Sequence, residues 1–378
     1  MQVLKAFRGS IAVSIIVLAL VGILSGSIAL VATAFILAIL EVTLSFDNAV
    51  VNAKYLKKMS PLWQKLFLTV GILIAVFGMR LVFPIVIVQI TAGLGFTEVV
   101  DLALNDSERY ADELDEAKNA IYAFGGVFLL MLFLDWVFEE KEIKWLTPLE
   151  SALERIGRLN QLSVVVAGIA IMLGSRVAEG EDAAATVLFS GFAGLVTYLT
   201  VSSLDSFFDD EDDKAEGTLP AGSDSGGSGV GGATAAVGKA GFSTFLYLEL
   251  LDASFSFDGV IGAFAISSNV LVIAAGLGIG AVFVRSMTVY LVRQGTLGEY
   301  RYLEHGAHWA IGALATILLL ELEFHIPEIL TGVLGLAFII TALVSSVRAN
   351  RHDAAARVQA EDRNSGPSTG PRRVGSDV

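Results

Sequence analysis

Two short strings in this chain place a carboxylate where a membrane helix ordinarily has none. Both read Ser-Phe-Asp, at Ser45–Asp47 and Ser256–Asp258, and both lie inside long apolar runs. Glu41 and Asp252 each stand six positions before the aspartate of their string. Carboxylate, hydroxyl and amide oxygens suit hard divalent cations such as Mn²⁺, Mg²⁺ or Ca²⁺. The pattern therefore predicts a cation site among apolar helices.

Helical geometry groups the polar residues around each string. At about 100° per residue, two sets each share one face of a helix: Glu41, Ser45 and Asn48, and Asp252, Ser256 and Gly259. In a continuous helix, Asp47 and Asp258 would lie about 120° from those faces. We therefore expect a helix break near each string, which would bring the acids together and free backbone carbonyls. Gly259 and Gly262 favour the break in the second helix, whereas the first helix has no glycine there.

Further charged residues stand inside the predicted helices and are given supporting roles: Glu249, Asp135, Glu321, Arg80 and Arg285. Each charge near the bilayer centre costs about 2.5–3.5 kcal/mol on insertion scales, so membrane helices seldom carry many without a use for them. Because a guanidinium cannot coordinate a metal, Arg80 and Arg285 are expected to be counter-ions or gates. The alternative is that the acids pair with these arginines and only hold the bundle together.

The hydropathy of the chain indicates which elements carry these residues. Of its 378 residues, 54% are hydrophobic and 17% are charged, whereas soluble domains carry about 25% charged residues. The mean hydropathy is +0.69. These values predict an all-α polytopic membrane protein, because about 18 apolar residues can cross the hydrocarbon core. We expect about ten spans: Ile11–Leu24, Ile28–Val51, Leu66–Ile90, Ala120–Phe138, Leu162–Leu173, Ala184–Leu204, Phe242–Ile266, Val270–Val292, Ala307–Leu322 and Ile329–Val347.

Two of these predicted spans have an alternative interpretation. The fifth, Leu162–Leu173, is short and could be a re-entrant segment. The first follows Lys5 and Arg8 and could be a signal peptide, but another apolar helix begins almost at once at Ile28, so we expect a retained span. Lysine and arginine favour cytoplasmic loops, and ten spans with both termini cytoplasmic place most of them there. We therefore expect a multi-pass protein of the plasma (inner) membrane.

Charge and small residues divide the chain into segments. The expected order is an N-terminal membrane helix (1–27), a first membrane repeat (28–140), a central pair of helices (141–204), a cytoplasmic linker (205–241), a second repeat with the last helix (242–347) and a basic tail (348–378). The linker is acidic and then rich in glycine and serine. Such a sequence buries too little apolar surface to order itself, so we expect a flexible linker, and likewise a disordered tail.

The two halves on either side of the linker resemble each other at three places in the same order. The matches are Glu41–Asp47 with Asp252–Asp258, Gly71–Arg80 with Gly276–Arg285, and Gly126–Asp135 with Gly312–Glu321. Each match puts a charge at the same point of a span. The first unit begins at the second span and the other at the seventh, and this odd offset predicts two inverted three-helix repeats. Many secondary transporters have that architecture.

At these residues the chain resembles the TerC family of integral membrane proteins. The family pattern Glu-x-x-Leu-x-x-Asp-Asn is matched at Glu41–Asn48. A second pattern, Glu-x-x-Asp-x-x-Phe-x-x-Asp-Ser, is matched at Glu249–Asp258, with Gly259 in place of the serine. The resemblance covers Ile28–Phe138 and Ser243–Val347, whereas the central helices and the linker look peculiar to this branch.

The resemblance implies a protein of the tellurium-resistance and manganese-exporter type. Its substrate would be a divalent cation, with Mn²⁺ the first candidate, and no prosthetic group is implied. The ligand candidates that the resemblance gives are Glu41, Asp47, Asn48, Asp252 and Asp258. Gly259 removes one side-chain oxygen from the family pattern, which leaves the coordination number and the choice of ion open. The expected partners are the lipid bilayer and the cation.

Two other functions remain open on the sequence. A membrane scaffold for metal or tellurite stress tolerance would recruit a protein partner through the acidic linker, without transport of its own. An intramembrane aspartyl protease would use Asp47 and Asp258 as a dyad that shares a proton, but the Gly-x-Gly-Asp signature is absent. We do not expect this protein to be an enzyme or to bind nucleic acid. The absence of cysteine, and of histidine near the strings, argues against Zn²⁺ or Cu⁺.

Overall fold

The computed structural model describes residues 2–57, 59–159, 161–178, 180–216, 239–267, 269–294 and 300–364. Within these ranges the side chains of residues 2–6, 44, 46–47, 204–216, 239–240, 257–258, 261, 265, 294, 328–329 and 354–364 are not described. Asp47 and Asp258 are among them. Their backbones belong to helices, but the predictions that depend on their carboxylates lie outside the described residues.

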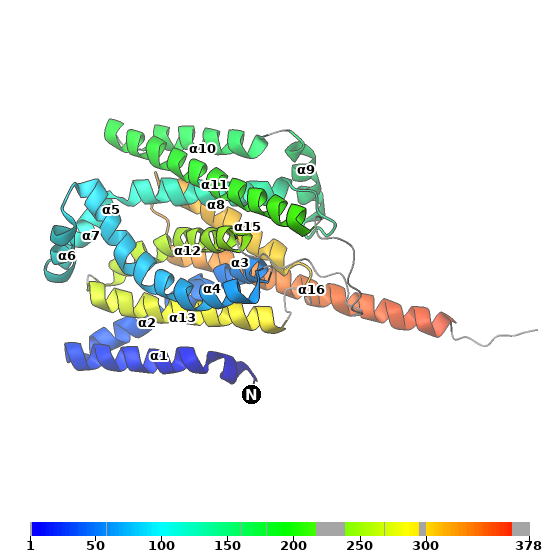
Figure 1. Ribbon diagram of the computed structural model, residues 1–378, viewed down its shortest axis with the longest axis horizontal. Helices are drawn as coiled ribbons and strands as arrows, with labels where there is room; N and C mark the ends of the chain where they lie inside the picture. The colour runs from blue at the N-terminus through cyan, green and yellow to red at the C-terminus, as the bar shows by residue number, and fades with distance from the viewer. Residues whose placement is uncertain are drawn as a thin grey trace, which may run out of the picture.

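The regular structure of the described chain is helical throughout, as predicted. The elements are α1 (Gln2–Ser25), α2 (Ile28–Leu44), α3 (Phe46–Leu56), α4 (Pro61–Leu73), the π-helix η1 (Ile74–Val82), α5 (Phe83–Ala92), α6 (Phe96–Asn105), α7 (Ser107–Glu116), α8 (Lys118–Phe138), α9 (Thr147–Gly157), α10 (Leu162–Val177), α11 (Glu181–Glu216), α12 (Lys239–Ile266), α13 (Val270–Gln294), α15 (Leu303–Leu320) and α16 (Glu328–Asn364). Most of the long helices run roughly along one axis, from α1 at one edge of the bundle to α10 at the other (Figure 1).

Seven helices in the described part of the chain are long and apolar enough to cross a membrane, or nine if each of two bent helix pairs is one span. The protein is thus a polytopic helical membrane protein, as the hydropathy predicted. Nine of the ten predicted spans lie on these helices. The remaining one, Phe242–Ile266, lies on α12, which carries the three acids Glu249, Asp252 and Asp258.

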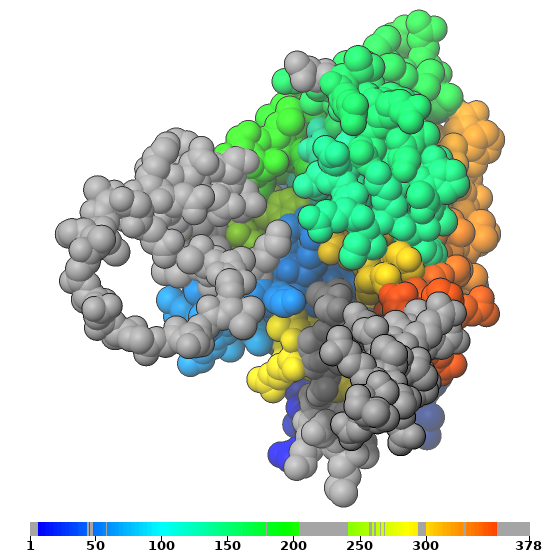
Figure 2. Space-filling model, turned by 90° about the vertical axis from the view of Figure 1, so that its right-hand side faces the viewer, coloured from blue at the N-terminus to red at the C-terminus, as the bar shows by residue number. Residues whose placement is uncertain are grey.

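The two ends of the described chain lie at the same end of the helix bundle. In Figure 1 the N-terminal end of α1 and the C-terminal end of α16 lie at one end of the bundle, which we call the tail end. The opposite end, where α6 and α7 lie, is called the far end. Figure 2 views the tail end, where the region around α9 covers a large part of the surface.

The first Ser-Phe-Asp string breaks its helix. α2 ends at Leu44, α3 begins at Phe46, and the two segments are bent by 57°. Ser45 between them has φ −96° and ψ 20°, outside the helical range, although its N–H still donates to Glu41 O. The predicted break is therefore confirmed in the first half, at a position without glycine.

The second string does not break its helix. α12 is helical from Lys239 to Ile266, through both Gly259 and Gly262, so the prediction of a break there is wrong. Gly259 serves close packing instead, because a Cβ at this position would lie 2.9 Å from Glu41 Oε2. The missing side chain makes room for a carboxylate from the other half of the chain.

The third predicted span contains the π-helix η1, between α4 and α5. Pro84, just after η1, has no N–H to donate, and its ring clashes with the carbonyl four residues earlier in an α-helix. Arg80 lies in the widened segment, and its Nη1 donates to Ala75 O at 2.6 Å. Such π segments are frequent at functional sites, and here the segment carries a buried guanidinium.

The fifth predicted span lies on α10, which packs against α8 and α11. The preceding helix, α9, is bent by 97° from α10. Its buried Glu150 accepts a hydrogen bond from Trp309 Nε1 at 3.1 Å and lies 3.2 Å from His305 Nδ1. These contacts fix α9 to α15 at the tail end, where the chain turns into α10.

Three helices extend into segments that were predicted from the sequence to be without order. α11 runs to Glu216, within the predicted linker 205–241, and α12 begins at Lys239; residues 217–238 lie outside the described residues. α16 runs to Asn364, within the predicted tail 348–378. The alanines of Ala354–Ala356 are the strongest helix formers, which explains why the helix continues beyond its apolar part.

Candidate functional site

Glu41 and Arg80 form an ion pair in the interior of the bundle. Each side chain is 3% exposed, and Arg80 Nη2 donates to Glu41 Oε1. Ser45 Oγ donates to the same oxygen at 3.2 Å. Glu41 and Ser45 lie one turn apart at the end of α2, as predicted, whereas Arg80 comes from η1. This carboxylate is therefore held by one charged donor and one neutral donor.

Arg285 of α13 is shared by two carboxylates of α12. Its Nη2 donates to Glu249 Oε1 at 3.3 Å and to Asp252 Oδ2 at 3.4 Å. The same nitrogen lies 3.4 Å from Gly71 O, and the guanidinium lies 3.7 Å from the centre of the Phe67 ring. Two buried acids thus share one positive charge.

A direct hydrogen bond joins the regions of the two Ser-Phe-Asp strings. Asn48 Nδ2 on α3 donates to Asp252 Oδ1 on α12 at 2.8 Å, and both residues are buried. Asp252 therefore meets Asn48 through one oxygen and Arg285 through the other. The fold brings together two predicted ligands that are 204 positions apart in the sequence.

Glycines let neighbouring helices approach these carboxylates closely. A Cβ at Gly280 of α13 would collide with the Glu41 side chain, and a Cβ at Gly71 of α4 would lie 2.5 Å from Glu249 Oε1. Gly276, one turn before Gly280, lies against the backbone of α2. Two small residues four positions apart are typical of closely packed membrane helices.

The structure buries some of the predicted ligands and supporting residues and leaves the side chains of others undescribed. Glu41, Asn48 and Asp252 are buried, with Ser45, Glu249, Arg80 and Arg285 around them. Ser256 is also buried, and its hydroxyl has no hydrogen-bond partner among the described residues. The ligand roles of Asp47 and Asp258 stay predictions, because their side chains are not described. In the described part of the chain, no group of three or more Asp, Glu or His residues is arranged to hold a metal ion.

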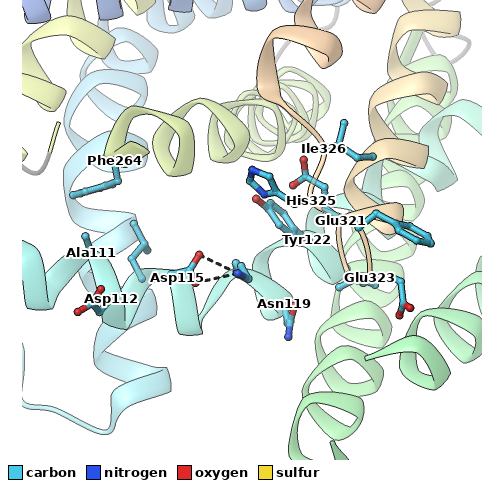
Figure 3. A pocket seen from close by; sticks show the side chains of 14 residues that line it. Ala111, Asp112, Asp115, Asn119, Tyr122, Phe264, Glu321, Glu323, His325 and Ile326 are labelled. Carbon is cyan, nitrogen blue, oxygen red and sulfur yellow. Dashed lines mark hydrogen bonds and ion pairs between the residues drawn. The ribbon is translucent and has the colours of Figure 1, made fainter. Parts of the chain in front are cut away.

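Glu321 lies apart from the buried ion pairs, in a pocket at the far end. The pocket has a volume of about 600 Å³ and is lined by α7, the start of α8, the end of α12 and the loop after α15. The Glu321, Tyr122 and His325 side chains gather on one side of it (Figure 3). Burial raises the pKa of the Glu321 carboxyl above its ordinary value, although a hydrogen bond from Tyr122 opposes the shift. The pocket is therefore acidic, but its most buried acid resists ionisation.

Asp135 lies in a second pocket, of about 290 Å³, at the tail end. Tyr198 donates a hydrogen bond to Asp135 Oδ2 at 2.8 Å. Lys54 and His308 also line this pocket, and Lys54 Nζ forms an ion pair with Glu304 at 2.6 Å. Asp135 and Glu321, both predicted as supporting residues, thus lie in pockets at opposite ends of the bundle.

Two features of the structure were not predicted from the sequence. Asn52, one turn after Asn48 on α3, is 0% exposed; its helical spacing from Asn48 was the signal that could have found it. The other feature is the contact between His308 and Trp136, whose rings stack with centroids 4.4 Å apart. No spacing rule links these two residues, since their helices are far apart in the sequence.

The described carboxylates at the centre outnumber the guanidiniums. Glu41, Glu249 and Asp252 face Arg80 and Arg285, which leaves one formal negative charge unbalanced among the described residues. An uncompensated buried ion costs several kcal/mol. This arrangement therefore favours uptake of a proton or of a cation.

A known protein family matches most of the chain. The family described as protein of unknown function (DUF475) matches residues 46–353. The chain belongs to this family. The matched part of this DUF475 protein includes Asn48, Asp252 and both pockets, and it begins after α2, which carries Glu41. No curated protein and no solved structure matches the chain.

Proposed function

We propose that this DUF475 protein is a membrane transporter that exports a divalent cation by alternating access at its buried carboxylates. The observation that carries the proposal is Arg285, which two acids, Glu249 and Asp252, share inside the bundle. A bound cation would supply the missing positive charge and would leave when the site opens to one side. The oxygen ligands, in a chain without cysteine, suit a hard ion.

Packing between α8 and α15 supports two inverted repeats. A Cβ at Gly126 would lie 3.1 Å from Leu319, and a Cβ at Gly312 would lie 2.7 Å from Phe133. In the sequence match, Gly126 corresponds to Gly312 and Phe133 to Leu319, so the two contacts are exchanged versions of each other. Reciprocal contacts of this kind are what a twofold relation between two units produces.

The two pockets support the same architecture. Asp135 and Glu321 correspond in the sequence match, and they line pockets at opposite ends of the bundle. An inverted pair of units places corresponding residues on opposite sides of the membrane. In the proposal, each pocket is the water-facing mouth through which the central site opens in one of the two states.

The direction of the chain ends supports ten spans. The N-terminal end of α1 and the C-terminal end of α16 lie at the same end of the bundle (Figure 1), which requires an even number of crossings. The nine candidate spans, with each bent pair taken as one, become ten when α12 is added. We propose that the tail end is cytoplasmic and that the membrane is the plasma (inner) membrane, because the loop lysines and arginines favour that side.

The ion and its ligands follow from the resemblance to the TerC family. We propose Mn²⁺ as the substrate, with Glu41, Asp47, Asn48, Asp252 and Asp258 as ligands. Asn48 and Asp252 already meet at 2.8 Å, so an ion bound between their oxygens would displace a hydrogen bond rather than open a packed core. In this proposal Arg80 and Arg285 are the counter-ions that hold the acids when the ion has left.

Ion flux into proteoliposomes tests the proposal. The purified protein should carry Mn²⁺ across the membrane, and Ca²⁺ or Mg²⁺ in excess would show the order of preference. Asp47→Asn and Asp258→Asn should each abolish the flux and leave membrane insertion intact. If either variant carries Mn²⁺ as fast as the wild type, the ligand assignment is wrong; if the wild type carries none of the three ions, the transport proposal is wrong.

A further inference from the structure

Among the described residues, Asn52 stands out as a buried amide without a hydrogen-bond partner. It lies in the middle of α3, its side chain is 0% exposed, and neither Oδ1 nor Nδ2 has a hydrogen-bond partner among the described residues. α3 is enclosed by α12, α13 and α15, which accounts for the complete burial. Leaving a buried amide unpaired costs free energy, so a use for these two atoms is expected.

Contacts between α2–α3 and α12 place Asn52 along the candidate site. Glu41 meets Gly259, Asn48 bonds Asp252 at 2.8 Å, and the Tyr55 and Tyr247 hydroxyls lie 3.2 Å apart. Residue numbers rise along α2–α3 while they fall along α12, so the two segments run antiparallel. Asn52 therefore lies between the second and third contacts, level with Glu249.

Polar residues continue along this contact from the tail-end pocket to the buried acids. Tyr55 and Tyr247 line the tail-end pocket. Asn48, Asn52 and Tyr55 fall within about 60° of one another around α3, since they are four and three residues apart. An ion that moves from the pocket to Asp252 along this face of α3 would pass Asn52 about one helical turn before it reaches Asn48.

We infer that the Asn52 amide is a binding group for the cation, on the path between the tail-end pocket and Asp252. This inference rests on the proposed transport function. The amide oxygen is a hard ligand that replaces one water of a partly dehydrated cation. The Glu249 carboxylate lies at the same level of the bundle as Asn52. The next polar group toward the centre is the Asn48–Asp252 pair. Negative surroundings favour a cation over an anion at this point.

Replacing Asn52 by leucine separates a binding role from a structural one. Leucine has a similar volume and no polar atoms, so in Asn52→Leu an unpaired amide is exchanged for an apolar group. We expect the melting temperature without metal to be equal to or higher than that of the wild type. We expect a given concentration of Mn²⁺ to raise the melting temperature less than in the wild type, because the apparent affinity for Mn²⁺, measured in flux, should fall by about tenfold.

Ser254→Ala is the matched control. Ser254 is also buried on α12, but its Oγ donates to Leu250 O within its own helix, so its removal should leave both Mn²⁺ responses within about twofold of the wild type. Asn52→Ala serves as a second variant without a bulky side chain and should show the same weakened response to Mn²⁺.

The outcomes distinguish this inference from the transport proposal. If wild type and Ser254→Ala respond to Mn²⁺ and Asn52→Leu or Asn52→Ala responds equally, the role of Asn52 is wrong while transport stands. If both Asn52 variants fail to fold, the amide supports the fold and the inference is again wrong. If the wild type itself shows neither flux nor stabilisation by Mn²⁺, the proposed function has failed, and the inference with it.

Discussion

Arg80 and Arg285 are both buried, yet they hold their acids differently. Among the described acids, Arg80 pairs with Glu41, and it uses its second terminal nitrogen on Ala75 O. Arg285 divides one nitrogen among Glu249, Asp252 and a backbone carbonyl, at 3.3–3.5 Å. Breaking a buried pair costs about 3–5 kcal/mol, so these arginines stabilise the bundle whether or not the acids bind an ion. The structural and the ion-binding interpretations of the acids are therefore compatible.

Glu321 gives a prediction at the scale of a single residue. Burial raises the pKa of its carboxyl, so the folded state prefers the protonated form. Protonated Glu321 therefore stabilises the folded state at pH values below the ordinary pKa of glutamate, and this contribution to the free energy of unfolding is lost as the pH rises through the raised pKa. Glu321→Gln stays neutral at all pH values. We expect its melting temperature in detergent to match the wild type in acid and to exceed it increasingly as the pH rises.

A neighbouring acid provides the control for this comparison. Glu323 lies on the same loop and is exposed, so Glu323→Gln changes the loop charge without changing a buried group. A pH profile of Glu321→Gln that runs parallel to the wild type would contradict the assignment of the shift to burial.

At the scale of elements, Gly280 sets how closely α13 approaches α2. A Cβ at this position would collide with the Glu41 side chain, and Glu41 is held in place by Arg80 and Ser45. Overpacking of this kind typically costs about 1–3 kcal/mol. We expect Gly280→Ala to lower the melting temperature in detergent and to reduce Mn²⁺ flux.

Gly168 of α10 provides the control position for the Gly280→Ala substitution. It lies within a helix, and nothing is found within 4 Å of a Cβ placed there, so Gly168→Ala should be neutral or stabilise the protein by about 0.5–1 kcal/mol. Equal melting temperatures for the two alanine variants would show that the contact at Gly280 is not tight.

The helices could be predicted from the sequence, but the role of Gly259 could not. Runs of about 20 apolar residues have one stable arrangement in a membrane, which is why the predicted spans coincide with helices. A glycine, in contrast, permits either a break or a close contact. Gly259 makes a close contact because Glu41 lies against it, and that neighbour is 218 positions away (259 − 41) in the sequence.

Part of the candidate site could be predicted from the sequence and part could not. The buried acids stood out in the sequence because charges are costly in apolar runs. Their partners did not, because pairing Glu41 with Arg80, or Asn48 with Asp252, depends on which helices become neighbours. Asn52 was overlooked because an amide carries no charge, and its spacing from Asn48 became meaningful only with the complete burial of its side chain.

At the scale of the whole molecule, the acidic end of α11 separates a transporter from a scaffold. The run Asp209–Asp213 lies on α11 and carries five acids. Replacing these residues by Asn and Gln keeps the length and removes the charge. We expect Mn²⁺ flux in proteoliposomes to stay at the wild-type rate, because the run lies outside the candidate spans.

The same variant also tests the scaffold in cells. A transporter without a recruiting role should still relieve manganese stress when these charges are absent. Loss of tolerance in cells, with normal flux in proteoliposomes and normal insertion, would instead indicate a protein partner for the acidic run.

The length of α16 has a consequence outside the membrane. Its 37 residues make a rod of about 55 Å, whereas the hydrocarbon core is about 30 Å thick. Near the point where α16 leaves the span Leu330–Asp353, Arg301 forms an ion pair with Asp353, which braces the rod at its base. Figure 1 shows α16 projecting past the other helices. The C-terminal end of α16, at Asn364, therefore stands above the lipid surface at a height that the length of the helix sets.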